Sequence, residues 1–104
     1  MALIKEQVVS VTVKYYVLFC IAADYCKIEA FQLKGPSDLG VLLDIICAKY
    51  GPQFHQHVFG ADGRLKSTAW FIINGKKIDS ESLFSVSLTD GDEVIISSPL
   101  LVGG

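Results

Sequence analysis

One amphipathic helix, set between strand-like segments, limits the folds that this chain can adopt. After the break Lys34-Gly35-Pro36-Ser37, apolar residues recur at three- and four-residue steps from residue 39 to residue 50, and Gly51-Pro52 ends the pattern. This spacing predicts a helix with one apolar face, and Ser37 is its expected N-cap. The apolar face comprises Leu39, Leu42, Leu43, Ile46, Cys47 and Tyr50. Such a face needs a second layer to cover it.

Alternation before the helix predicts two strands that supply this layer. Every second residue from Val9 to Tyr15 is apolar, so one side of this segment is expected to face a core. Residues 26–33 alternate again and predict a second strand, antiparallel to the first. The apolar stretch 17–24 between them predicts a helical turn or short helix.

The second half of the chain predicts a hairpin and a final strand. Asn74-Gly75 is a strong signal for a two-residue hairpin turn. The expected elements are a short helix or loop at 54–59, a turn at 61–64, strands at 68–73 and 76–78, an irregular crossing at 83–88, a tight turn at 89–92 and a last strand at 93–98.

This order of elements predicts an α+β domain of the β-grasp type, with the main helix on one face of a mixed sheet. The last strand should run beside the first and leave the other sheet face open. The length of 104 residues suits one domain. We expect a short leader at residues 1–7, the β-grasp domain at 8–98, and a flexible C-terminal tail at 99–104 with nothing to pair with it.

Composition excludes several classes of protein. The net charge is −2 and the lysines are scattered, so no basic face for nucleic acid is expected. Cys20, Cys26 and Cys47 form no C-x-x-C pair, which indicates buried thiols in a reducing compartment. The longest apolar run, Tyr15–Ala23, is shorter than the about 20 residues that a bilayer requires. We therefore expect a cytoplasmic protein that does not bind a membrane.

The C-terminal motifs resemble a known family. The segment Leu88-Thr-Asp-Gly-Asp-Glu-Val94, followed by Pro99 and by Gly103-Gly104, resembles the small subunit of molybdopterin synthase (MoaD type). The thiamine-pathway carrier ThiS and the ubiquitin-related modifiers, including small archaeal modifier proteins, share much of this pattern. The resemblance covers residues 8–104, because the segments 11–19, 38–43, 49–51 and 73–76 also fit.

Two departures from the family pattern bear on its branch and on its contacts. The segment 52–67 is longer than in compact members, which favours the larger MoaD-like or archaeal modifier branch over ThiS. Ser97-Ser98-Pro99 stands where apolar residues and a second proline are common, so the partner contact there can differ.

The resemblance implies a sulfur carrier that is no enzyme on its own. A MoeB-like adenylating enzyme would use ATP to activate the Gly104 carboxylate, and the acyl-adenylate would accept sulfur as a thiocarboxylate. A MoaE-type large subunit would then receive the sulfur for molybdenum or tungsten cofactor synthesis. Gly103 and Gly104 lack a Cβ and so can pass through a narrow channel. The same tail chemistry would also serve a ubiquitin-like protein modifier or a tRNA-thiolation carrier. No permanently bound cofactor is expected.

A partner surface is expected on the open sheet face. Alternation directs Tyr16 and Ile95 away from the core, and exposed apolar groups there would suit docking. Trp70 is placed equally well on this face or in the core. The tail residues Leu100, Leu101 and Val102 would extend the same surface.

Other sites are disfavoured by their spacing. Residues 90–93 lack the separated ligands of a calcium loop, so a solvated turn is expected there. His55 and His57 are two residues apart and share no helix face, so no metal site is expected. A binding module without tail chemistry remains a third class of function.

Overall fold

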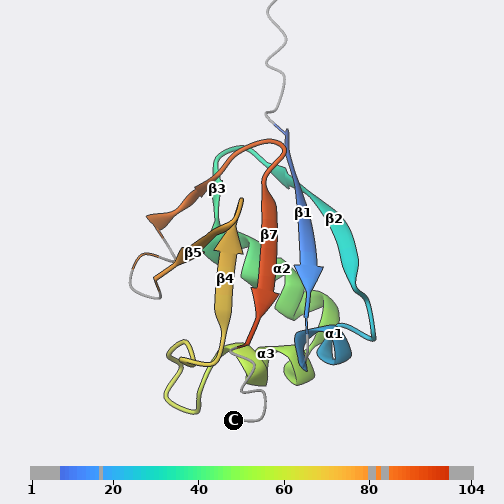
Figure 1. Cartoon of the computed structure of the whole chain (residues 1–104), viewed down its shortest axis with the longest axis vertical. Coiled ribbons are helices and arrows are strands. Elements are labelled where there is room, and N and C mark those ends of the chain that lie inside the picture. The colour runs from blue at the N-terminus through green and yellow to red at the C-terminus, as the bar shows by residue number, and fades with distance from the viewer. Residues whose placement is uncertain (1–7, 17, 80–81, 83–84, 99–104) are drawn as a thin grey trace, which may run out of the picture.

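The computed structural model describes residues 8–98 except 17, 80–81 and 83–84. Its main feature is a five-stranded sheet in the order β2-β1-β7-β4-β5 (Figure 1). β1 and β7 are parallel neighbours, and the other neighbouring pairs are antiparallel. The strands of this sheet are β1 (Val8–Tyr15), β2 (Ile28–Lys34), β4 (Trp70–Ile73), β5 (Lys76–Ile78) and β7 (Glu93–Ser97). The predicted mixed sheet, with the last strand beside the first, is confirmed.

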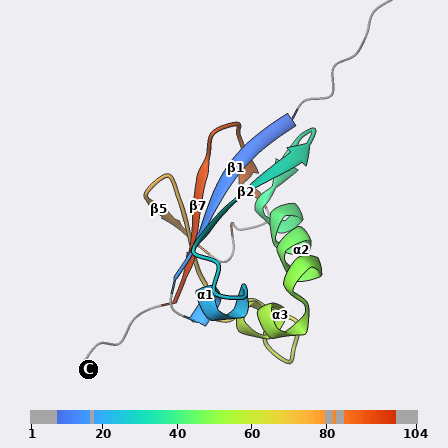
Figure 2. The same ribbon diagram turned by 90° about the vertical axis from the view of Figure 1, so that its right-hand side faces the viewer.

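The main helix covers one face of this sheet. Figure 2 shows α2 (Leu39–Tyr50) and α3 (Pro52–Val58) on the same side of the strands. The short helix α1 (Leu18–Ala22) lies at one end of the sheet and contacts α3. No helix within the described ranges covers the opposite face, which we call the open face. This arrangement is the predicted α+β β-grasp fold.

The alternation in β1 separates the core from the open face. Val11, Val13 and Tyr15 are at most 1% exposed and point to the side of the sheet that the helices cover. Tyr16, which follows them, is 46% exposed. The side chains that complete the core come mainly from all three helices and from β2, β4, β6 and β7. Burial of these apolar groups is the main favourable contribution to folding.

The N-cap of α2 is Asp38, so the prediction of Ser37 was wrong. The Asp38 carboxylate accepts a 2.9 Å hydrogen bond from the backbone N–H of Val41. Ser37 is instead buried in a two-residue strand, β3 (Ser37–Asp38), which pairs with β6 (Ser87–Leu88). The same pairing corrects the irregular crossing predicted at 83–88 only in its last two residues, which form β6. Residues 83 and 84 lie outside the described part of the chain.

Gly51 and Pro52 end one helix and begin the next. Gly51 has a φ of 78°, in the left-handed region that glycine tolerates, and its N–H bonds to the carbonyl of Cys47. Pro52 occupies the first turn of α3, where its missing N–H leaves no unmade bond. Of residues 54–59, predicted as a short helix or loop, residues 54–58 are therefore helical.

The hairpin at Asn74-Gly75 is confirmed. Both residues have a positive φ, of 50° and 85°, as a type I′ turn requires. The strand before the turn begins at Trp70, two residues later than the predicted position 68.

The three cysteines are free thiols, as predicted, but they are half-buried rather than buried. Burial raises the pKa of the Cys47 thiol above its ordinary value, and the nearby Asp44 charge acts in the same direction. None of the helices within the described ranges is long and apolar enough to cross a bilayer.

Candidate functional site

The predicted reactive tail lies outside the described residues, but the point from which it leaves the sheet is defined. Gly103, Gly104 and the preceding residues 99–102 are not described. β7, the strand that leads to them, lies between β1 and β4. The N–H of Tyr16 donates a 3.0 Å hydrogen bond to the carbonyl of Ile96, near the end of this strand. The chain therefore leaves the middle of the sheet beside Tyr16.

The open face brings together the three predicted partner-facing residues of the folded domain. Ile95 lies beside Lys14 on β1 and beside Ile72 on β4. Trp70 lies opposite Ser97, one position further along the same face. We define the apolar part of the open face as Tyr16, Trp70, Ile72 and Ile95.

The register of β4 with β7 decides the position of Trp70. Phe71 and Ile73 are 2% and 8% exposed and face the core. Because neighbouring strand residues point to opposite faces, Trp70 and Ile72 belong to the open face. Trp70 is half-buried there, with the Lys77 ammonium 4.5 Å from the centre of its ring.

Charged groups border these apolar residues. Lys14 and Glu93 on neighbouring strands form a 3.0 Å ion pair. The hydrogen bond to Glu93 raises the pKa of Lys14 above its ordinary value. The pair is partly exposed, so its contribution to stability is small.

The predicted turn at residues 89–92 is present, but Asp92 in it is buried rather than solvated. Its carboxylate accepts hydrogen bonds of 2.8 Å from the N–H of Thr89, 2.9 Å from the Thr89 hydroxyl and 2.8 Å from the Asn74 amide. Asp90 accepts a 2.8 Å bond from the N–H of Ser10. The acidic motif therefore holds strand ends together.

Opposing effects act on the Asp92 carboxyl group. Burial alone would raise its pKa, but the hydrogen bonds from the Thr89 N–H, the Asn74 amide and the Thr89 hydroxyl outweigh this effect. The pKa of Asp92 therefore lies below its ordinary value, and the residue stays ionised at neutral pH.

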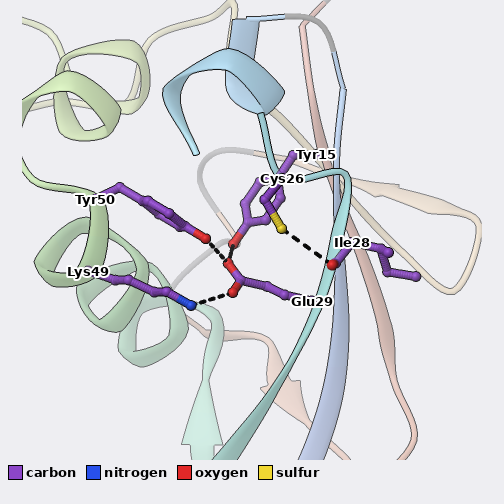
Figure 3. A network of polar contacts seen from close by, with 6 residues as sticks. All are labelled: Tyr15, Cys26, Ile28, Glu29, Lys49 and Tyr50. Atoms are coloured by element: carbon purple, nitrogen blue, oxygen red, sulfur yellow. Dashed lines mark hydrogen bonds and ion pairs between the residues drawn. The ribbon is translucent and has the colours of Figure 1, made fainter. Parts of the chain in front are cut away.

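A polar cluster between β2 and α2 was not anticipated. The Tyr15 hydroxyl donates a 2.7 Å hydrogen bond to Oε1 of Glu29, and the Tyr50 hydroxyl donates to the same oxygen (Figure 3). Lys49 forms an ion pair with Oε2. The cluster joins the C-terminal turn of α2 to the edge of the sheet. Both carboxylate oxygens of Glu29 already have partners within the domain. Glu29 shares a strand face with the buried Phe31, which was the available sequence signal.

The pKa values in this cluster follow from its contacts. Burial would raise the pKa of Glu29, but the hydrogen bonds from Lys49, Tyr50 and Tyr15 lower it overall. Burial, followed by the bond to Glu29, raises the pKa of both Tyr15 and Tyr50. The carboxylate and the two hydroxyls therefore keep complementary donor and acceptor roles at neutral pH.

The described residues hold no group of three or more metal-ligating side chains. His55 is exposed and its ring packs 4.8 Å from that of Phe59, while His57 packs against Phe19 at 6.2 Å. Each imidazole thus has an aromatic neighbour on or beside α3.

The mixed sheet, the helix across one face and the exit from its central strand define a ubiquitin-like β-grasp protein. The sequence matches no protein-family model and no curated protein. Solved structures match across nearly the whole chain. Small archaeal modifier protein 1 from Haloferax volcanii is 22% identical with a TM-score of 0.74, over 88% of this chain and 97% of that one.

Two further structures are slightly more similar in sequence. Small archaeal modifier protein 1 from Methanosarcina acetivorans is 26% identical, with a TM-score of 0.70, over 94% of this chain and 99% of that one. A Pyrococcus furiosus protein, provisionally described as molybdopterin converting factor subunit 1, is 26% identical with a TM-score of 0.68, over 88% and 99%. The resemblance to the MoaD-like and archaeal modifier group of ubiquitin-like proteins is therefore confirmed.

Proposed function

We propose that this chain is a MoaD-type sulfur carrier, which carries sulfur as a thiocarboxylate on Gly104. The observation that carries the proposal is the exit of the chain from the central strand β7, beside an apolar open face. A partner that binds this face would hold the tail close to its own active site. The ending Gly103-Gly104 supplies the narrow backbone that such a site needs.

The proposed chemistry takes place at the terminal carboxylate. A carboxylate oxygen of Gly104 attacks the α-phosphorus of ATP and releases pyrophosphate, which gives an acyl-adenylate. A sulfur nucleophile at the oxidation level of hydrosulfide then attacks the carbonyl carbon and displaces AMP, which leaves the thiocarboxylate. The catalytic side chains belong to the adenylating enzyme, of MoeB type, and to a MoaE-type large subunit that takes the sulfur. This chain is the donor subunit, and we place it in the cytoplasm.

A second function is favoured by the two small archaeal modifier proteins among the similar structures. In this alternative, a lysine amine attacks the same acyl-adenylate and displaces AMP, or attacks a thioester made from it and displaces the thiol. An amide bond then joins Gly104 to a target protein. A carrier for tRNA thiolation would use the tail in the same activated form. Conjugates on lysine would distinguish the modifier from the cofactor carrier.

Extension of the tail by one residue tests the proposal. One added residue moves the reactive carbonyl by about 3.3–3.6 Å, whereas reacting groups must be held to about 0.5 Å. We expect an alanine added after Gly104, or deletion of Gly104, to abolish adenylation and sulfur loading without moving the thermal melt. Intact-mass spectrometry with ATP, adenylating enzyme and a sulfur source should show one oxygen exchanged for sulfur in the native chain alone. Equal loading of the extended chain would refute the role of the Gly104 carboxylate.

A further inference from the structure

A surface cavity lies at the β4–β5 edge of the open face. Its volume is about 420 Å³, and its lining includes Lys66, Ser67, Trp70, Lys77 and Asp79. We call it the Trp70 notch. The Lys77 ammonium lies 4.5 Å from the centre of the Trp70 ring, so a cation and an aromatic face meet inside it.

The notch continues the open face. Trp70 on β4 lies opposite Ser97 on β7. Lys77 on β5 lies opposite Ile72 on β4. Paired residues of antiparallel strands share one side of the sheet. A protein that covers Ile72 and Ile95 therefore also reaches Trp70 and Lys77.

The charge of the open face differs in sign from that of the whole chain. The chain has a net charge of −2. The charged residues that the strand register places on the open face are Lys14, Lys34 and Lys77, against Glu93. Glu93 is already paired with Lys14 at 3.0 Å. Within the described ranges, Lys66 and Lys77 have no carboxylate at ion-pair distance.

We propose that the Trp70 notch binds an acidic side chain of the protein partner that docks on the open face. A carboxylate between Lys66 and Lys77 would make charge-assisted hydrogen bonds, and its methylene groups would pack on the indole ring. Tryptophan is enriched among the residues that carry most of the binding energy at interfaces. Complementary charge across a protein interface also speeds association. The inference rests on the proposed function only in naming this partner as the adenylating enzyme or large subunit.

The composition of the notch favours a protein over a nucleic acid. Nucleic-acid sites need an extended row of cations along the phosphate backbone. The notch has two lysines, and the charge of Asp79 offsets one of them, which leaves too little positive charge for a phosphate chain. A single carboxylate needs only the two amines.

Intrinsic fluorescence tests the inference directly, because Trp70 is the chain's one tryptophan. The probe is a hexaglutamate peptide, titrated to millimolar concentration, with a hexaglutamine peptide and a thymidine oligonucleotide as comparisons. We expect a saturable change in fluorescence with hexaglutamate alone. Raising the salt from about 0.1 M to about 1 M shortens the Debye length from about 10 Å to about 3 Å and should abolish the change.

Two neighbouring lysines provide a matched pair of variants. Lys77→Glu should weaken hexaglutamate binding by about tenfold. Lys76→Glu makes the same change in charge one residue away, but Lys76 lies opposite Ile73 on the other side of the sheet. The Lys76→Glu variant should therefore bind hexaglutamate as the native chain does. Urea unfolding of both variants controls for folding, and Lys77→Gln repeats the test without charge reversal.

Equal weakening in the Lys76 and Lys77 variants, or no response to hexaglutamate, would overturn the inference. A response to the oligonucleotide alone would overturn it in favour of a nucleic-acid ligand. The titration does not involve Gly104, so its failure is separate from a failure of the sulfur-carrier proposal.

Discussion

The side-chain amide of Asn74 donates a 2.8 Å hydrogen bond to Oδ1 of Asp92 and thereby joins two turns that are distant in the sequence. Asn74 lies in the β4–β5 hairpin, and Asp92 ends the turn before β7. The N–H of Glu93 returns a 2.9 Å bond to the Asn74 side-chain oxygen. This contact lies at the start of β7, whereas the tail leaves from its other end. The acidic motif therefore supports the strand that presents the tail.

Replacement of Asp92 should destabilise the fold more than replacement of Asp90. Asp92→Ala leaves the Thr89 N–H and Asn74 amide without their acceptor and should lower the free energy of unfolding by about 2–3 kcal/mol. Asp90→Ala removes one exposed bond to Ser10 and should cost about 1 kcal/mol. Urea unfolding measures both. Equal losses would contradict the structural role of Asp92.

The Glu29 cluster should make stability depend on acidic pH. Its hydrogen bonds hold the pKa of Glu29 below the ordinary value of 4.5. A carboxyl group with a lowered folded pKa stabilises the fold above its unfolded pKa, and this contribution is lost as the pH falls through the folded pKa. The free energy of unfolding should therefore decrease as the pH falls below 4.5.

The Glu29→Gln variant isolates this contribution. It should be less stable than the native chain at neutral pH, because the ion pair with Lys49 is lost. It should also lose less stability on acidification, and the remaining decrease should come from groups such as Asp92, whose pKa is lowered in the same way. Urea unfolding at several pH values compares the two chains. Parallel pH profiles would assign the acid sensitivity to other carboxyl groups.

The open face and the tail should act as one docking surface. Tyr16→Glu or Leu101→Glu should weaken binding to the adenylating enzyme by about tenfold, because each places a charge in an apolar contact. Ile45→Glu is the control, since Ile45 is 38% exposed on α2, away from this face. Binding can be followed by calorimetry. Unchanged affinity in both open-face variants would count against this surface.

The cysteines should be dispensable for sulfur loading. Cys20, Cys26 and Cys47 are half-buried, and burial keeps the Cys47 thiol protonated by raising its pKa. Their joint replacement by alanine or serine should cost about 1–3 kcal/mol of stability through lost apolar contact. Thiocarboxylate formation, measured by intact mass, should persist. A folded triple variant that no longer loads sulfur would indicate a cysteine persulfide in place of the thiocarboxylate.

Local patterns in the sequence were sufficient for most of the fold. The alternation that ends at Tyr15 separates core from open face, because a strand has a period of two whatever its partners. The spacing from Leu39 to Tyr50 places one face of α2, and Asn74-Gly75 determines a hairpin through the φ angles that it tolerates. Each of these features depends on residues close together in the chain.

Contacts between distant residues decided the rest. Trp70 lies in a run that is apolar on both faces, so only its register opposite Ser97 places it on the open face. Ser37 resembles a helix cap in the sequence, but its pairing with Leu88 makes it part of a strand and leaves the cap to Asp38. Such pairings depend on which segments meet in space, and local spacing does not contain that information. The sequence therefore determined most of the elements, whereas the tertiary structure decided which side chains surround the exit of the tail.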